Sequence, residues 1–297
     1  MRPVFETVLP WEPVGVTLIG DPHTFKVASL TERLRDDLQA ACDRDDIIGV
    51  YGDIDEWIVP SDLRRYSAKH ASRVSAYVNA RVNELADFYA PYANNIAWMK
   101  LGNHETAFIK HHFVDPMAML IQELNRRRTA EGLIFYGGYT MWWQIKFLHT
   151  TGEGKRNGST SVKFWLHHGA GGNSPVTKGA ISRARIQDAI IGADVYAIGH
   201  LHTAASIPTT KEYLDDYGNV KRKRVDFLIV PGYSGWEQQA PTEDGYMLDW
   251  GSETHYGLEE VGFVRILLEP KMRSGGGLNI KRTIMTESDD VPMEISG

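Results

Sequence analysis

Five short apolar runs in this chain end abruptly in Asp, Asn or His, mostly beside a glycine. They read LIGDPH from residue 18, GVYGD from 49, MKLGNHE from 99, FWLHHG from 164 and AIGHLH from 197. In an open α/β sheet, functional groups gather outside the carboxyl ends of the strands. The repeated pattern therefore predicts an α/β fold in which five strands bring their terminal polar residues to one edge.

Helical and β-prone segments alternate around these runs. Hydrophobic spacing predicts strands at 14–19, 47–51, 96–101, 162–166 and 195–198, and helices at 29–41, 62–89, 116–128 and 180–191. Residues 133–148 predict two strands or one bent strand, and 224–233 and 261–270 predict further strands. Because the sequence has no internal repeat and no linker, we expect a single domain over 1–297. It would carry a helical insertion at about 60–91 and a β-rich part at about 204–286.

Composition and charge limit the location and the partners. The 42% hydrophobic and 24% charged residues are typical of a globular protein, and no apolar stretch is long enough to span a bilayer. Residues 1–13 combine proline and charge, unlike a signal peptide, and the single Cys42 suggests a reducing compartment. We therefore expect a cytoplasmic protein without membrane contact. The net charge of −6 gives no overall attraction to nucleic acid, although a local basic groove would still permit binding.

The polar residues that end the runs are suitable metal ligands. They are Asp21, His23, Asp53, Asn103, His167 or His168, His200 and His202. Oxygen and imidazole ligands without a thiolate suit divalent cations such as manganese, iron, zinc or nickel. Seven ligands are too many for one ion that keeps an open position. A carboxylate shared by two ions resolves the excess, and two-metal sites of this kind serve phosphoryl displacement.

In order, the runs give Asp-x-His, Gly-Asp, Gly-Asn-His-Glu, a histidine block and Gly-His-x-His between residues 21 and 202. This series resembles the calcineurin-like metallophosphoesterases. The resemblance implies a four-layer αββα sandwich with the site at the C-terminal ends of the strands. It also implies a phosphoesterase in which a hydroxide bridging two divalent ions attacks phosphorus in line. Manganese is the first choice of ion, with iron, zinc, nickel or magnesium as alternatives.

The resemblance also assigns roles by position. Asp21, His23 and His202 would hold one ion. Asn103, His200 and either His167 or His168 would hold the other, and Asp53 would bridge the two. His104 would assist the leaving group and would not bind metal.

The second run continues as GDIDEW, without the arginine that follows in the Ser/Thr protein phosphatases. Asp55 and Glu56 are expected to accept hydrogen bonds from ligand histidines, and Trp57 to line a substrate pocket. These acidic neighbours favour a phosphodiester over a dianionic monoester. A cation from Lys178, Arg183 or Arg185, at the start of the helix predicted at 180–191, would reverse that preference.

Three alternatives stay open for the function: a phosphomonoesterase, a nuclease-like DNA- or RNA-processing protein, and a non-catalytic scaffold of the same fold. The acidic net charge disfavours the nuclease, and the complete ligand set disfavours the scaffold. The basic stretch KRKR at 221–224 is predicted to lie in a solvated hairpin. We expect a small phosphate ester as substrate, with nucleic acid possible, and the sequence does not indicate an oligomeric state.

Overall fold

The computed structural model describes residues 3–25, 30–57, 78–150, 156–171, 180–234, 261–272, 274 and 277–288. The strands are β1 (Val4–Pro10), β2 (Val14–Ile19), β3 (Ile47–Val50), β4 (Ile96–Met99), β5 (Phe135–Tyr136), β6 (Thr140–Thr150), β7 (Arg156–His167), β8 (Val195–Ile198), β9 (Ala205–Leu214), β10 (Val220–Ile229), β11 (Gly262–Met272) and β12 (Leu278–Ser288). The helices are α1 (Thr31–Asp43), α2 (Val78–Tyr89), α3 (Asn103–His112), α4 (Pro116–Arg127) and α5 (Ala180–Ala189), with a short 3-10 helix η1 (Ala90–Tyr92).

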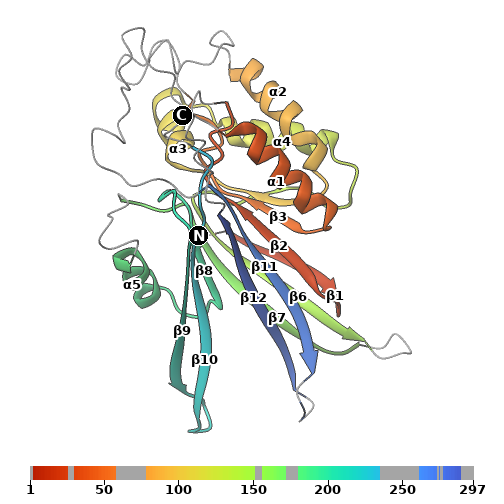
Figure 1. The fold of residues 1–297 in the computed structure, drawn as a ribbon, viewed down its shortest axis with the longest axis vertical. Helices are drawn as coiled ribbons and strands as arrows, with labels where there is room; N and C mark the ends of the chain where they lie inside the picture. The colour runs from red at the N-terminus through yellow and green to blue at the C-terminus, as the bar shows by residue number, and fades with distance from the viewer. Residues whose placement is uncertain are drawn as a thin grey trace, which may run out of the picture.

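The strands form two six-stranded sheets that face each other. One sheet has the order β1-β6-β7-β8-β10-β9, and the other has the order β12-β11-β2-β3-β4-β5. Figure 1 shows α1 to α4 gathered on the side of β2 and β3, with α5 beside β8 and β9. The predicted αββα sandwich is confirmed. For convenience, the sheet that contains β2 is called the front sheet and the sheet that contains β7 the back sheet.

Three clusters of apolar side chains fill the spaces between the four layers. Leu34, Ile48, Leu85 and Leu120 belong to the cluster between the front sheet and its helices. Val16, Trp143, Phe164 and Leu228 belong to the cluster between the sheets. Trp165, Tyr196 and Phe227 belong to the third cluster, against which Ile186 of α5 packs. Each layer therefore has its own hydrophobic contact with the next.

The central strands are apolar on both faces because each contacts two of these clusters. In β2, Leu18 points into the layer between the sheets, while Ile19 points toward the helices. In β8, Ala197 and Ile198 divide in the same way between the inner cluster and the α5 cluster. Consecutive strand residues point to opposite faces, so a strand covered on both sides appears as a continuous apolar run. This geometry explains the runs seen in the sequence.

The helix α4 shows clear local sequence signals. Asp115 caps its N-terminus by accepting a hydrogen bond from the Ala118 N–H, and Pro116 occupies the first helical position. Met117, Leu120, Ile121 and Leu124 are buried at spacings of three and four, so one face packs toward the front sheet. Two arginines in the last turn suit the negative end of the helix dipole.

The strands β9 and β10 form an antiparallel hairpin that projects away from the convergence of the sheets. The KRKR residues lie on β10, and each has a carboxylate partner: Asp215 for Lys221, Glu212 for Arg222, Asp194 for Lys223 and Asp226 for Arg224. The hairpin prediction for this stretch is confirmed. Since its charges are paired, this basic stretch does not form an uncompensated cationic surface.

Several predicted elements agree closely with the structure, and others differ. The strands predicted at 14–19 and 195–198 are confirmed as β2 and β8. Helix α2 covers the end of the region predicted at 62–89, whose earlier part lies outside the described residues. The prediction did not include β1, although residues 4–10 pair in parallel with β6. In the described ranges, no helix is long and apolar enough to cross a lipid bilayer.

Candidate metal centre

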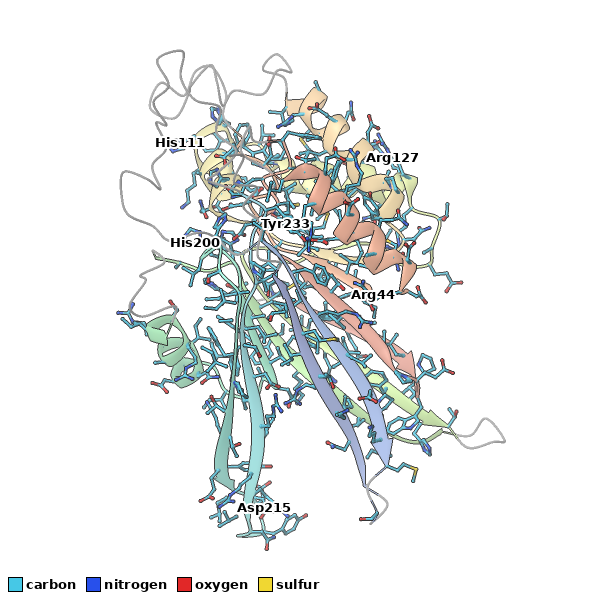
Figure 2. All side chains as sticks on the ribbon, viewed as in Figure 1. Arg44, His111, Arg127, His200, Asp215 and Tyr233 are labelled. Carbon is cyan, nitrogen blue, oxygen red and sulfur yellow. The ribbon has the colours of Figure 1, made fainter. Side chains whose placement is uncertain are left out.

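The predicted ligand residues follow the ends of five strands that come from both sheets. Asp21, Asp53 and Asn103 follow β2, β3 and β4 of the front sheet, and His168 and His200 follow β7 and β8 of the back sheet. Figure 2 shows His200 and Tyr233 at the end of the molecule where the strands converge, and Asp215 at the remote tip of the β9–β10 hairpin. The site thus draws one set of groups from each sheet.

The loops that hold these groups approach each other closely. A Cβ atom on Gly102 would lie 2.1 Å from Asp53 Oδ1, and one on Gly52 would lie 1.8 Å from the Gly102 nitrogen. Both distances are shorter than any tolerable contact. The glycines of the Gly-Asp and Gly-Asn pairs are therefore needed for close packing of the two loops.

Five predicted ligands have an unusual backbone conformation. Asp21, His23, Asp53, His200 and His202 have φ values of 28°, 42°, 56°, 69° and 47°. They account for five of the eight non-glycine residues with positive φ in the described ranges. Such conformations are costly for residues with a Cβ, and they concentrate at functional sites. The strained backbone indicates that the placement of these five side chains is favoured over local backbone stability.

His168 lies at the meeting point of the two sheets. Its Nε2 is 2.9 Å from Asn103 Oδ1 and 3.3 Å from Asp53 Oδ2, and its Nδ1 is 3.5 Å from Asp21 Oδ1. One ligand atom each of Asp53, His168 and His200 lies within 4.8 Å of the others. These residues form a compact group that could hold one ion.

A second group lies around Asp21. His202 Nε2 is 3.8 Å from Asp21 Oδ2, and the ring of His202 stacks on that of His23 at 5.4 Å between centroids. The backbone N–H of His200 donates to Asp21 Oδ2, and that of His23 donates to the Asp53 carbonyl at 2.9 Å. The two groups therefore lie side by side and share the Asp21–His168–Asp53 contacts.

The sequence left the choice between His167 and His168 open, and the structure brings only His168 into the cluster. His167 continues the outer face of β7, where it stacks on Trp165 at 5.3 Å between ring centroids. Its Nδ1 accepts a hydrogen bond from the Gly169 N–H at 2.9 Å.

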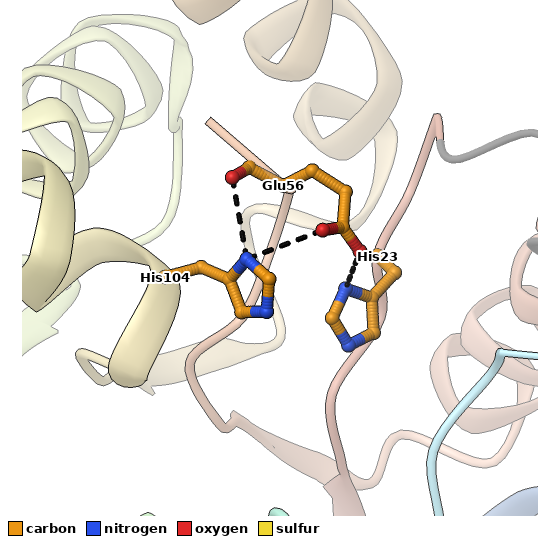
Figure 3. Close-up of side chains that lie close together, drawn as sticks. All are labelled: His23, Glu56 and His104. Carbon is orange, nitrogen blue, oxygen red and sulfur yellow. Dashed lines mark hydrogen bonds and ion pairs between the residues drawn. The ribbon is translucent and has the colours of Figure 1, made fainter. Parts of the chain in front are cut away.

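Glu56 contacts two histidines at once, as Figure 3 shows. Its Oε1 is 2.9 Å from His23 Nδ1, and its Oε2 is 3.3 Å from His104 Nδ1. His104 Nδ1 is also 3.2 Å from the Glu56 carbonyl oxygen. The Nε2 atom of His104 lies 4.0 Å from Asp53 Oδ2. The predicted proximity of Glu56 to the site histidines is present as ion-pair contacts of its carboxylate, and the hydrogen bond to His104 involves its backbone carbonyl.

The roles predicted for Asp55 and Trp57 are not supported. Asp55 forms a two-point ion pair with Arg81, in which both contacts are 2.7 Å long. Trp57 is 5% exposed and packs near Phe108, so its ring is largely covered by other described residues. Of the cations considered beside the site, Lys178 lies outside the described residues, and Arg183 and Arg185 are on α5.

Glu105 is an important residue that the sequence analysis did not identify. It is completely buried, and its two oxygens accept hydrogen bonds from Gly102 N, Asp53 N, Ile54 N and Trp57 Nε1 at 2.8–2.9 Å. It therefore fixes the Asp53 loop against the first turn of α3. The available signal was its place three residues after Gly102, which is the N3 position of a capping box.

The charges of the site are strongly perturbed by burial. Burial raises the pKa of the Asp21 carboxyl to about 7, opposed by His168 and reinforced by Asp53. Burial also acts on Asp53, but the neighbouring histidines, His168 first, hold its pKa below the ordinary value. The two carboxylates in turn outweigh the burial of His168 and raise its pKa. Burial therefore disfavours the ionised form of Asp21, which a bound cation would favour, whereas Asp53 keeps its negative charge in a dry environment.

The donor set fits divalent cations. Asp21, Asp53 and His168 are buried, and in the described part of the structure Asp21 Oδ1 accepts no hydrogen bond. A buried carboxylate oxygen without a donor is costly unless a cation or proton compensates it. Carboxylates, an amide oxygen and imidazoles together suit manganese, iron or zinc. The group of Asp53, His168 and His200 could therefore hold metal, and so could His23, Glu56 and His104, whose ligand atoms also lie within 4.8 Å of one another.

No protein-family model and no curated protein matches this chain. Three solved structures are similar over most of its length. Vps29 of Chaetomium thermophilum has 11% identity and a TM-score of 0.33, covering 93% of this chain and 97% of that one. Protein TM1076 of Thermotoga maritima has 14% identity and a TM-score of 0.30, covering 92% and 99%. GAP50, an anchor in the inner membrane complex of Plasmodium, has 9% identity and a TM-score of 0.39, covering 94% and 87%. The function is therefore inferred from the site itself.

Proposed function

We propose that this protein is a phosphoesterase that uses two divalent metal ions. The observation that carries the proposal is the pair of buried carboxylates, Asp21 and Asp53, with His168 within 3.5 Å of both. Two bound cations would supply a nucleophilic water near neutral pH and would neutralise charge on the phosphate. Asp21, His23 and His202 would hold one ion, Asn103, His168 and His200 the other, and Asp53 would be shared.

His104 would serve the leaving group. Glu56 lies at Nδ1 of this histidine, which leaves Nε2 directed toward Asp53 and the centre of the site. In its doubly protonated form, a histidine held in this way can give a proton from Nε2 to a departing alkoxide. Because Glu56 also contacts His23 Nδ1, one carboxylate orients both a proposed metal ligand and the proposed acid.

The test combines metal analysis with activity. Protein loaded with Mn²⁺ should contain about two ions per chain and hydrolyse aryl phosphate esters. Asp53→Asn should lower metal content and activity together. Asp45→Asn is a matched control, because Asp45 is exposed and has the same φ of 56° as Asp53. One ion per chain with full activity would contradict the dinuclear proposal, and binding without hydrolysis of any ester would favour the scaffold alternative.

We further propose that phosphodiesters are preferred to monoesters. Glu56 brings an acidic group to the His23–His104 side of the site, which disfavours a dianionic monoester. Because Trp57 is buried, the expected contact between its ring and the substrate does not support this preference, which therefore rests on the charge of Glu56 alone.

The decisive comparison is kcat/KM for p-nitrophenyl phosphate against bis-p-nitrophenyl phosphate with one metal and at one pH. Glu56→Gln should reduce the ratio of kcat/KM for the diester to kcat/KM for the monoester. Glu32→Gln, at an exposed position of α1, should leave this ratio unchanged. A monoester preference in the wild type that is lost in Lys178→Ala would refute the charge argument.

A further inference from the structure

A completely buried lysine lies between the two sheets, close to the candidate metal centre. Lys100 directly follows β4, and its Nζ donates hydrogen bonds to two backbone carbonyls, one in β7 of the back sheet and one in the bend just before β6. These are the carbonyls of Leu166 at 2.9 Å and Tyr139 at 3.1 Å. Lys100 is not a proposed ligand, but it links the sheets at the level of the site.

Both carbonyls are part of the backbone that holds His168 in place. Leu166 lies two residues before His168 in the chain. The Tyr139 carbonyl also accepts the His168 N–H at 3.1 Å, and the Tyr139 hydroxyl donates to the Gly169 carbonyl at 2.8 Å. Lys100 and Tyr139 therefore hold the turn that presents His168.

On its other side, Lys100 is fixed to the front sheet. Its backbone N–H donates to the Val50 carbonyl at 3.0 Å, and Asn103 follows three residues later. Asn103 Oδ1 and His168 Nε2, 2.9 Å apart, come from different sheets. The link through Lys100 therefore connects the supports of two proposed ligands of the same ion.

The surroundings of Lys100 are otherwise apolar. Leu166, Trp98 and Met141 belong to the cluster between the sheets, and the Tyr51 ring centroid is 5.8 Å from Nζ. An ammonium is expensive to bury in such a layer, where a methionine would fill the space without that cost. Burial accordingly lowers the pKa of Lys100 well below its usual range, and a specific benefit should offset the burial of this polar amine, which the carbonyls of Leu166 and Tyr139 hold in place.

We propose that Lys100 is a positioning residue that sets the separation between Asn103 and His168, and so tunes the affinity of one metal position and not the other. This inference rests on the proposed function, since it presupposes two metal positions. It concerns the position formed by Asn103, His168 and His200. The ligands of the other position, Asp21, His23 and His202, lie outside the turn that Lys100 holds, so that position keeps its own backbone supports.

The test is calorimetric titration of metal-free protein with Mn²⁺. The titration should resolve two Mn²⁺ binding classes, each with its own dissociation constant. Asn103→Ala should remove the class that belongs to the position of Asn103, His168 and His200, and His23→Ala the class that belongs to the position of Asp21, His23 and His202. Lys100→Met should weaken the Asn103 class by about 10- to 100-fold, the usual effect of removing a residue that orients a ligand. It should leave the His23 class unchanged. Lys100→Gln keeps hydrogen-bond donors without the charge and should recover part of the affinity. Lys163→Met, at an exposed position of β7, is the matched control.

A second measurement does not need metal. Because Lys100 and the His168 N–H share the Tyr139 carbonyl, Lys100→Met should accelerate hydrogen exchange of the His168 amide in the metal-free protein. Equal weakening of both classes, or unchanged exchange and affinity, would overturn the role of Lys100. A wild type that binds no metal would overturn the proposed function, and the amide exchange would still show whether Lys100 holds the His168 turn.

Discussion

At the scale of single residues, the chemistry of the site depends on which ring nitrogen of each histidine is in contact with a carboxylate and which one faces the centre. Glu56 contacts the Nδ1 atoms of His23 and His104, so the Nε2 atoms of both remain available toward the centre. The two rings lie edge to face, with centroids 5.2 Å apart. A neutral histidine has one donor and one acceptor nitrogen, so fixing one fixes the function of the other. The two histidines therefore have their orientations set by one side chain.

His104→Gln should leave the metal content unchanged but lower turnover by a factor of about 10² to 10⁴, as expected for loss of a general acid. The loss should be smaller for esters with acidic leaving groups, which depart without a proton. Turnover of a series of aryl esters, with metal analysis of each preparation, gives the comparison. His111→Gln, on the exposed end of α3, should behave like the wild type. A loss independent of the leaving group would assign His104 a different role.

The ligand-bearing runs could be predicted because each consists of consecutive residues at a strand end. The choice between His167 and His168 could not. It depends on which face of β7 meets the other sheet, and both faces of that strand are apolar. The pairing of Asp55 with Arg81 was equally hidden, since it joins residues 26 positions apart. For Glu105, the capping position indicated the contact with the Gly102 N–H, but not the bonds from the Asp53 and Ile54 N–H groups, which lie on another loop.

At the scale of elements, a buried carboxylate joins two strands of the front sheet to the end of α1. Asp46 is completely buried and accepts hydrogen bonds from Thr17 of β2, Arg44 after α1 and Arg265 of β11. Burial alone would raise the pKa of Asp46, but these donors, Arg265 first, outweigh burial and lower it below 3.8. The ionised form is therefore the one that stabilises this junction.

Asp46→Asn should lower the free energy of unfolding at pH 7 by about 3 kcal/mol, because it leaves buried donors and a guanidinium poorly paired. Since the folded pKa lies below the unfolded one, the contribution is complete above about pH 4 and is lost as the pH falls through the folded value. The difference from the wild type should thus be equal at pH 7 and pH 5 and shrink below pH 4. Urea denaturation at each pH measures it. Asp36→Asn, at an exposed position of α1, should change stability by less than about 0.5 kcal/mol, and a difference that grew in acid would contradict the assignment.

Elements with strong periodicity could be predicted, whereas those defined by their neighbours could not. Helix α4 has its cap, its proline and its apolar spacing in the sequence. Strand β1 contains Glu6, Thr7 and a terminal Pro10, and it exists because β6 offers it a partner. As an outer strand, β1 can contain a proline at its end without losing an inter-strand bond on both sides.

At the scale of the whole molecule, the proposed metal ions would connect the two sheets. Asp21, Asp53 and Asn103 belong to the front sheet, and His168, His200 and His202 belong to the loops of the back sheet. A ligand that binds only the folded protein stabilises it by mass action. Metal binding and unfolding of the sandwich should therefore be linked.

Mn²⁺ at about 100 times its dissociation constant should stabilise the protein by about 2.7 kcal/mol for each site. The melting temperature should rise with metal concentration and fall after chelation. Asp53→Asn should lose most of this dependence, while Asp45→Asn should retain it. Differential scanning calorimetry over a metal series makes the measurement. A melting temperature that does not respond to metal, in protein shown to bind it, would exclude a connection across the sheets.

The left-handed backbone at five proposed ligands has a consequence for how this protein would respond to selection. Each such residue costs about 1–3 kcal/mol relative to a relaxed conformation, and glycine at the same position would remove most of that cost. In a medium without metal, where no bound ion offsets this cost, selection for heat resistance alone should therefore favour replacement of Asp21, His23, Asp53, His200 and His202. Thermostable descendants obtained without an activity screen would keep the sandwich and lose its metal centre, so stability and activity are maximal in different sequences.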